Sequence, residues 1–248
     1  MIHEQWYFAG RSLVAAYARW ILKADIQHRS AIPEGPKIFV ANHPSTSDPA
    51  WITVLVSEHV SILIKDLLFN VPLFGQSLHL SGHIPVSPNN GRAALDLAVA
   101  RLQSGRSVVV FPEGEISPLS GGYQRPHTGA ARLALLTGAP VIPVGIGLDH
   151  KNLRVIPARV KGMLDEGYWY LNGPYAMTVG SSINFQGDAE DRTQVGDALD
   201  HIMRTVNILA LDSFARVRSA RPAHVGVGSM VGLGWQLFGR LVYQLSSI

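Results

Sequence analysis

The sequence predicts an α/β fold, with a mostly parallel central sheet flanked by helices and an amphipathic helix at each end of the chain. Two observations predict this fold. Short apolar runs alternate with helical patterns over most of the chain, which is the order expected of strand–helix units in a parallel sheet. Apolar residues make up 47% of the 248 residues and charged residues only 16%, so one large core is expected and disorder is excluded.

The first element is an amphipathic helix at the membrane interface, within residues 1–30. Aromatic residues are interleaved there with basic ones, and positions 11, 15, 19 and 23 share one helical stripe. Residues 1–30 hold four Lys/Arg against two Asp/Glu, a net charge of +2. A helix of this kind lies in a membrane interface with its rings at headgroup depth. The alternative is that the helix simply packs on the core.

The central elements follow in order. Strands are expected where short runs of apolar and β-branched residues occur, at 37–41, 60–64, 82–86, 106–111, 140–146, 153–158 and 176–185. Helices are expected in the gaps, at 49–58, 72–80, 90–104, 127–137 and 190–215. The last of these is the clearest, because its apolar residues recur at helical spacing. Two long loops are expected where Gly, Pro and Ser gather, at 112–126 and 159–175.

The last element is an apolar C-terminal helix within residues 221–248. The fifteen residues from Val225 to Gly239 carry no charge, which is fewer than the roughly 20 that a spanning helix needs. We therefore expect this helix to lie at the membrane interface or to be half-buried, with packing on the core as the alternative.

The basic charge at both apolar ends of the chain distinguishes between two kinds of partner, a membrane surface and nucleic acid. Residues 204–248 hold five Lys/Arg against one Asp/Glu, a net charge of +4, whereas residues 31–203 hold twelve against fifteen, or −3. Basic residues beside apolar and aromatic ones favour a membrane surface over nucleic acid, so no nucleic-acid partner is expected. No secretory signal is visible. We expect a membrane-associated protein on the cytoplasmic face.

The absence of cysteine excludes several classes of site. With no cysteine in the chain, there is no disulfide framework, thiolate zinc site, iron–sulfur cluster or cysteine nucleophile. The histidines outside the motif described next have no spacing typical of metal ligands. We therefore expect no metal and no bound cofactor.

The first chemical motif follows the expected strand 37–41 and reads Asn42-His43-Pro44-Ser45-Thr46-Ser47-Asp48-Pro49. His43 stands at the carboxyl end of a strand, where α/β proteins place their sites. Asp48 precedes a proline, which predicts a helix N-cap that holds the carboxylate near His43. A carboxylate that accepts from one imidazole nitrogen makes the other nitrogen a better base toward a hydroxyl. For this pair alone, an incidental turn histidine beside a helix cap is the alternative.

Further motifs follow in the chain. Strand 106–111 leads into Phe111-Pro112-Glu113-Gly114-Glu115-Ile116-Ser117, and Gly129-Ala130 and Val141-Ile142-Pro143-Val144 come after it. Read with the Asn-His-x4-Asp motif, these segments resemble the glycerolipid acyltransferases of the lysophosphatidic acid acyltransferase type. The resemblance spans about residues 37–147 in matching order and spacing, which makes it more specific than any one motif.

The resemblance implies a function for residues 31–220, the expected catalytic domain. His43, oriented by Asp48, would remove a proton from the hydroxyl of a lysophospholipid acceptor such as 1-acylglycerol-3-phosphate. The acceptor would then attack the thioester of an acyl-CoA or acyl-carrier protein, without a covalent acyl-enzyme. The oxyanion would meet backbone N–H groups near the His43 turn or the Gly114 loop. The resemblance also implies the residues that bind substrate: Asn42, Gly82, Glu113, Gly114 and Ser117.

Two departures from the family pattern concern the acceptor. Pro88 and Ile116 occupy positions where the family has arginines associated with the acceptor phosphate, and Glu115 adds a negative charge. Arg92 and Arg125 are candidate replacements, although both are equally well read as solvated surface residues.

Two alternatives to the leading function therefore stay open. One is the same chemistry on a phosphate-free lipid, sugar or amine acceptor. The other is a non-catalytic lipid-binding protein, against which the intact His43, Asp48 and Glu113 argue.

Overall fold

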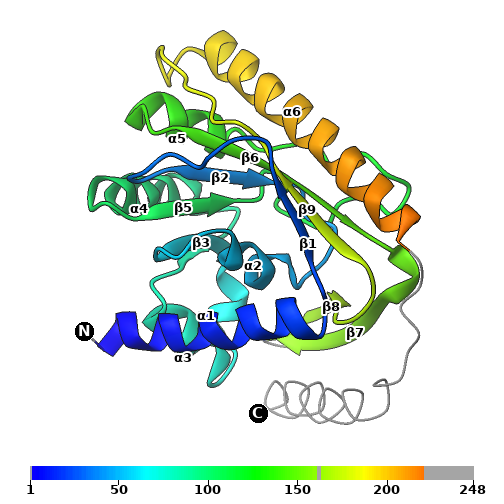
Figure 1. The fold of residues 1–248 in the computed structure, drawn as a ribbon. Coiled ribbons are helices and arrows are strands. Elements are labelled where there is room, and N and C mark those ends of the chain that lie inside the picture. Colours follow the sequence, from blue (N-terminus) through cyan, green and yellow to red (C-terminus); the bar gives the residue numbers. More distant parts are fainter. Residues whose placement is uncertain (1, 161–162, 221–248) are drawn as a thin grey trace.

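A computed structural model describes residues 2–160 and 163–220 of the chain. The C-terminal helix expected within residues 221–248 lies outside the described residues. The remaining elements form the α/β fold that the sequence predicts, with a central sheet between two layers (Figure 1).

The central sheet has seven strands in the order β1-β9-β6-β2-β5-β3-β4. Neighbouring strands pair in parallel except β6 and β9, which pair antiparallel. The bounds are β1 Asp25–His28, β2 Ile38–Ala41, β3 Val60–Lys65, β4 Ile84–Val86, β5 Ser107–Val110, β6 Val141–Leu148 and β9 Tyr175–Val179. A separate hairpin is formed by β7 Leu153–Val160 and β8 Met163–Tyr170.

The helices cover both faces of this sheet. The α-helices are α1 Ile2–Trp20, α2 Asp48–Trp51, α3 Phe74–Leu80, α4 Gly91–Gln103, α5 Gly129–Thr137 and α6 Arg192–Ser219. Short 3-10 turns are η1 Ile52–Leu55, η2 Asp66–Asn70 and η3 His150–Asn152. Helices α4, α5 and α6 lie on one face, and α1, α2 and the hairpin lie on the other (Figure 1).

The sequence of β2 explains how one strand serves both layers. Successive side chains of a strand point to opposite faces of a sheet. Ile38 and Val40 are therefore packed in the core under α4, α5 and α6, whereas Phe39 and Ala41 are packed in the core under α1 and α2. All four side chains are buried, because the strand lies in the middle of a sheet that is covered on both faces.

The structure differs from the expected elements at several places. The predicted loop at 159–175 is wrong, because β8 pairs antiparallel with β7 from Leu153 opposite Tyr170 to Val160 opposite Met163. The aromatic run at 168–170 was the signal of that strand, since aromatic residues favour strands. Strand β1 was not expected, because its four residues are mostly exposed and polar. The strand expected at 176–185 ends at Val179.

Two glycines of β6 allow the helix layer to approach the sheet. A Cβ on Gly145 would lie 2.0 Å from the backbone carbon of Leu209 in α6, and one on Gly147 would lie 2.4 Å from the backbone nitrogen of Phe214. Ser213 of the same helix donates a hydrogen bond to the carbonyl of Gly145 over 2.8 Å. Helix α6 therefore packs directly against the backbone of β6 at these glycines. Strand β6 is the neighbour of β2, the strand that precedes the histidine motif.

Candidate active site

Three neighbouring strands bring the sequence motifs together. Strand β2 lies between β5 and β6, and all three run parallel. Residues that follow β2 and residues that follow β5 therefore meet at the carboxyl edge of the sheet, where α/β folds bind ligands. His43 follows the first strand and Glu113 follows the second.

Asn42 fixes the start of the histidine turn. Its side-chain amide donates to the carbonyl of Ile146 over 2.9 Å, and its Oδ1 accepts from the N–H of the same residue over 2.7 Å. The side chain is buried and continues the pairing of β2 with β6 beyond the last backbone pair. Both ends of the amide are occupied, so Asn42 positions the turn.

His43 and Asp48 form the pair that the sequence predicts. His43 Nδ1 lies 3.1 Å from Asp48 Oδ2. The ring stacks on Phe111, with centroids 4.4 Å apart, and 16% of the side chain is exposed. Within the described residues, Nε2 has no hydrogen-bond partner. Nε2 is therefore the nitrogen that is available to an incoming hydroxyl.

Asp48 is fully buried and accepts hydrogen bonds on both oxygens. Besides His43, the donors are Ser45 N–H to Oδ2 at 2.7 Å, Ser45 Oγ to Oδ1 at 2.6 Å and Tyr175 OH to Oδ1 at 3.0 Å. Burial, followed by the charge of Asp48, raises the pKa of Tyr175 well above its usual value, so the phenol stays a neutral donor. These donors fix the carboxylate beside the imidazole.

The predicted capping role of Asp48 is wrong in detail. Ser47 is the N-cap of α2, and Asp48 is the first helical residue, followed by Pro49. The carboxylate does not bond the N–H groups of the first turn of α2 but points back to the histidine turn. The two residues therefore come together as predicted, although by another local geometry.

Glu113 and Ser117 hold the backbone of His43. Glu113 Oε1 accepts from the N–H of His43 over 3.1 Å and from Ser117 Oγ over 2.6 Å. Ser117 Oγ also accepts from the N–H of His43 over 3.0 Å, and the N–H of Ser117 donates to the carbonyl of His43 over 2.8 Å. Both side chains are buried. The contacts link the turn after β2 to the loop after β5, so these residues position the His43 turn.

The predicted loop 112–126 closes over Glu113. The N–H of Gln124 donates to Glu113 Oε2 over 2.8 Å, and the N–H of His127 donates to the carbonyl of Pro112 over 2.8 Å. Gly114 has a φ of +66°, and a Cβ there would lie 3.2 Å from the ring of His127. Arg125 stands between these anchors, is exposed and forms no ion pair within the described residues.

The structure does not bring two predicted site residues to this cluster. Gly82 precedes β4 and therefore lies at the amino edge of the parallel sheet, opposite His43. Arg92 is exposed on α4 and pairs with Asp96 at 3.3 Å and Glu190 at 3.7 Å. His83, next to Gly82, is half-buried, and its Nδ1 accepts from the N–H of Ile62 over 3.2 Å. Burial lowers the pKa of His83 to about 4.

Sequence analysis missed three partners of the cluster: Ser45, Gln124 and Tyr175. Ser45 lies inside the motif, but nothing in the sequence shows that its hydroxyl turns toward Asp48. Gln124 contributes a backbone N–H, which carries no residue-type signal. Tyr175 is separated from Asp48 by 127 residues, so only the tertiary fold reveals the contact.

Two further features concern metals and membranes. In the part of the chain that the structure describes, no three His, Asp or Glu side chains gather as metal ligands would. Across residues 2–160 and 163–220, no helix combines the length and the apolar character needed to cross a membrane.

Comparisons with known proteins show what the chain is similar to. A model of the Acyltransferase family matches residues 23–147. The chain is 27% identical over 163 residues to a 1-acyl-sn-glycerol-3-phosphate acyltransferase of Haemophilus influenzae, which covers 60% of this chain and 67% of that protein. It is 32% identical over 125 residues to the protein of the same name from Escherichia coli, which covers 49% of this chain and 51% of that protein.

A solved structure shares the fold. The crystal structure of the 1-acyl-sn-glycerophosphate acyltransferase from Thermotoga maritima matches with a TM-score of 0.57 over 80% of this chain and 79% of that chain. The sequence identity is 22%. At this identity the match supports the fold, which is the arrangement of helices and strands, and nothing more.

Proposed function

The chain belongs to the Acyltransferase family, and on that premise we propose that it transfers a fatty acyl group to a hydroxyl of a lysophospholipid. The leading acceptor is 1-acylglycerol-3-phosphate, the substrate in the names of the relatives. The donor is an acyl-CoA or an acyl-carrier protein. The single observation that carries the proposal is the His43–Asp48 pair at 3.1 Å, with Nε2 unpartnered in the described residues and the ring partly exposed.

The proposed reaction has two coupled steps. His43 Nε2 takes the proton of the acceptor hydroxyl as its oxygen attacks the thioester carbonyl of the donor. The tetrahedral intermediate then collapses, the C–S bond breaks, and the imidazolium returns the proton to the leaving thiolate. The products are an ester and a free thiol, and Asp48 stabilises the transient positive charge on the ring. No acyl-enzyme forms.

The oxyanion requires N–H groups that are not already bonded. The N–H groups of His43 and Ser45 are occupied by side chains of the cluster, and that of Gly114 donates to the carbonyl of Phe111. The expected donors in the His43 turn are therefore committed. The N–H groups of Glu115 and Ile116 have no hydrogen bond within the described residues, and they directly precede Ser117, which bonds His43. We assign the oxyanion to this pair.

Arg125 is the candidate for the acceptor phosphate. It is exposed in the loop that closes over Glu113 and has no ion pair with any residue that the structure describes. We expect Arg125→Gln to raise the KM for 1-acylglycerol-3-phosphate by about 10- to 100-fold, the effect of losing a hydrogen bond to a charged group. The kcat should change little. The matched control is Arg204→Gln, because Arg204 is exposed on α6 on the other face of the sheet.

The second candidate function is the same reaction on an acceptor without phosphate. Pro88 and Ile116 replace the arginines of the family pattern, and Glu115 adds a negative charge beside the site, which favours a neutral acceptor. The test is acyl transfer by the full chain from labelled palmitoyl-CoA and palmitoyl-carrier protein to 1-acylglycerol-3-phosphate and to phosphate-free lysolipids. Turnover of the phosphate acceptor supports the leading proposal. Turnover of phosphate-free acceptors alone supports the second one.

A membrane surface is the proposed partner of α1. One face of this helix packs on the core through Tyr7 and Ala18. The opposite face exposes large apolar side chains at seven-residue spacing, with Trp6 51%, Leu13 74% and Trp20 69% exposed. The expected basic stripe is partly wrong, because Arg11 turns inward and donates to the carbonyls of Thr53 and Val56. The exposed face suits insertion between lipid headgroups.

Polar substitution of this face tests the proposed membrane contact. In the triple variant Trp6→Gln, Leu13→Gln and Trp20→Gln, we expect vesicle affinity to fall by at least about 10-fold, because each inserted side chain contributes on the order of 1 kcal/mol or more. Flotation of the full chain with anionic vesicles measures the affinity. The matched control is Ile208→Gln with Leu211→Gln, which removes exposed apolar side chains from α6. Equal flotation of the triple variant and the wild type would exclude α1 as the contact.

A further inference from the structure

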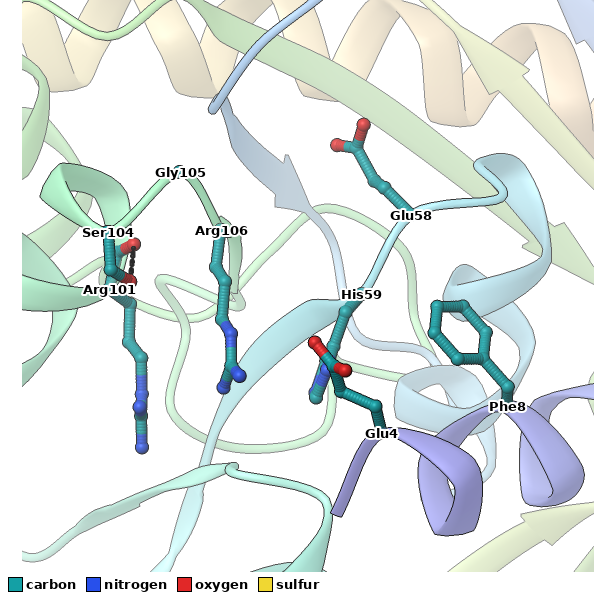
Figure 2. A pocket seen from close by; sticks show the side chains of 8 residues that line it. All are labelled: Glu4, Phe8, Glu58, His59, Arg101, Ser104, Gly105 and Arg106. Atoms are coloured by element: carbon teal, nitrogen blue, oxygen red, sulfur yellow. Dashed lines mark hydrogen bonds between the residues drawn. The ribbon is translucent and has the colours of Figure 1, made fainter. Parts of the chain in front are cut away.

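A hollow lies at the amino edge of the sheet, away from the cluster around His43. Its volume is about 540 Å³, and it is formed where the end of α4 and the start of β5 face the first turns of α1 (Figure 2). The side chains and turn that line it are Glu4, Phe8, Glu58, His59, Arg101, Ser104, Gly105 and Arg106. Arg106 directly precedes β5, whereas Glu113 follows it. The two residues therefore stand at opposite ends of β5, and the two sites are separate.

Two arginines converge in this hollow. Arg101 and Arg106 extend in the same direction in Figure 2. Arg106 Nη1 lies 3.4 Å, and Arg101 Nη2 3.8 Å, from the point that a Cβ on Gly82 would occupy. His59 Nε2 lies 3.9 Å from the same point. Two guanidinium groups are thus held beside one another around a glycine.

The charges of these arginines are not neutralised by the protein. Neither Arg101 nor Arg106 forms an ion pair within the described residues. The Nε of Arg101 is buried without a hydrogen-bond partner in that same part of the chain. Burial, followed by the positive charge of Arg106, lowers the pKa of Arg101. A buried donor without a partner is costly, and so is a pair of like charges.

Two carboxylates line the hollow, but within the described residues neither forms an ion pair with Arg101 or Arg106. Glu58 is engaged elsewhere, because its Oε1 accepts from Lys37 Nζ over 2.7 Å and from Ser107 Oγ. Glu4 is exposed on α1, and its charge acts on His59. The His59 ring stacks on Tyr7 at 3.9 Å and keeps its Nδ1 buried without a partner among the described residues. In the part of the chain that the structure describes, neither carboxylate of the lining is therefore an ion-pair partner of the two arginines.

We propose that this hollow is a second binding site, which takes a phosphate-bearing ligand between Arg101 and Arg106. Guanidinium groups match the oxygens of a phosphate with paired N–H donors. A phosphate would neutralise both charges and give the buried Nε its partner. The site does not depend on the proposed acyl transfer, since none of its residues belongs to the catalytic cluster.

The phosphate has two possible sources, a lipid headgroup or a soluble phosphate. Phe8 lines the hollow and also belongs to α1, whose exposed apolar face is the proposed membrane contact. A headgroup phosphate of a lipid that contacts α1 would reach the arginines from that side. A free phosphate would enter from solvent and bind without a membrane.

The experiment compares the full wild-type chain with Arg101→Gln/Arg106→Gln and with the control Arg204→Gln. The probes are inorganic phosphate, followed by the thermal unfolding midpoint, and flotation with phosphatidylcholine vesicles with and without phosphatidic acid. We expect phosphate or phosphatidic acid to act more strongly on the wild type and the control than on the double variant, which keeps Arg125. Saturating phosphate should raise the midpoint of the wild type and the control by at least about 2 °C. A response to phosphate identifies a soluble ligand, and a response to phosphatidic acid alone identifies a headgroup.

A second readout separates binding from a structural role of the arginines. Without phosphate, the double variant should unfold at the wild-type midpoint or above it, because the repulsion between the two guanidinium groups is removed. A lower midpoint would show that the arginines support the fold instead. An equal response of the wild type and the double variant to both probes would overturn the proposal.

Discussion

Replacing Asp48 by asparagine should lower the kcat of acyl transfer by about 10²- to 10⁴-fold, the range associated with a correctly held general base. Asp48 Oδ2 fixes the imidazole through Nδ1. Asparagine has nearly the same shape, but one of its two oxygens is replaced by an NH2 group, which cannot accept a hydrogen bond. Asp48 accepts from Ser45 N–H, Ser45 Oγ and Tyr175 OH, so this NH2 group would meet donors. The ring then loses both its orientation and the negative charge that stabilises the imidazolium.

The control for this variant is Tyr175→Phe. It removes one donor to Asp48 Oδ1 and leaves the contact between Asp48 and His43 intact. The effect on kcat should be less than about 10-fold, because one hydrogen bond to a charged group contributes about 1.5–3 kcal/mol and part of that loss falls on stability. Steady-state kinetics and thermal unfolding are measured on both variants. A folded Asp48→Asn enzyme with wild-type kcat would refute the assigned role of the carboxylate.

Replacing Gly145 by alanine should destabilise the fold by about 3 kcal/mol or more, at the upper end of overpacking effects. The added methyl group would lie 2.0 Å from the backbone carbon of Leu209 and 2.1 Å from the backbone nitrogen of Ala210. Backbone cannot rotate away as a flexible side chain can, so α6 must shift from β6. Denaturant unfolding measures the change.

Gly196→Ala in α6, the helix that packs on Gly145, is the matched control. A Cβ at this position of α6 meets nothing within 4 Å, so the substitution should stabilise the helix by about 0.5–1 kcal/mol. Opposite signs for the two variants would attribute the cost at Gly145 to the close approach of helix and strand. Equal stability of Gly145→Ala and the wild type would contradict this packing.

The sequence predicts the parts of the site that depend on local chain order. His43 and Asp48 lie within six residues, and Glu113 and Ser117 lie within five, so their motifs bring them together without knowledge of the fold. The strands that carry the motifs could also be predicted, because β2, β5 and β6 are buried on both faces and read as continuous apolar runs.

The rest depends on tertiary packing. Tyr175 reaches Asp48 from a distant strand, and the turn before α2 directs the carboxylate of Asp48 away from the helix N-terminus. The family pattern suggested Gly82 as a site residue, yet a residue that precedes a parallel strand lies at the opposite edge from one that follows it. Gly82 instead belongs beside Arg101 and Arg106, where no motif predicted a site.

The most direct test of the account is acyl transfer by the full chain and by His43→Ala, measured in parallel with labelled palmitoyl donors and lysolipid acceptors. His43 Nε2 is the assigned base, and the backbone of His43, which Glu113 and Ser117 hold, is unchanged by the substitution. We therefore predict that His43→Ala loses transfer to every acceptor that the wild type uses and keeps its unfolding midpoint. Transfer by a folded His43→Ala chain at the wild-type rate would contradict the account.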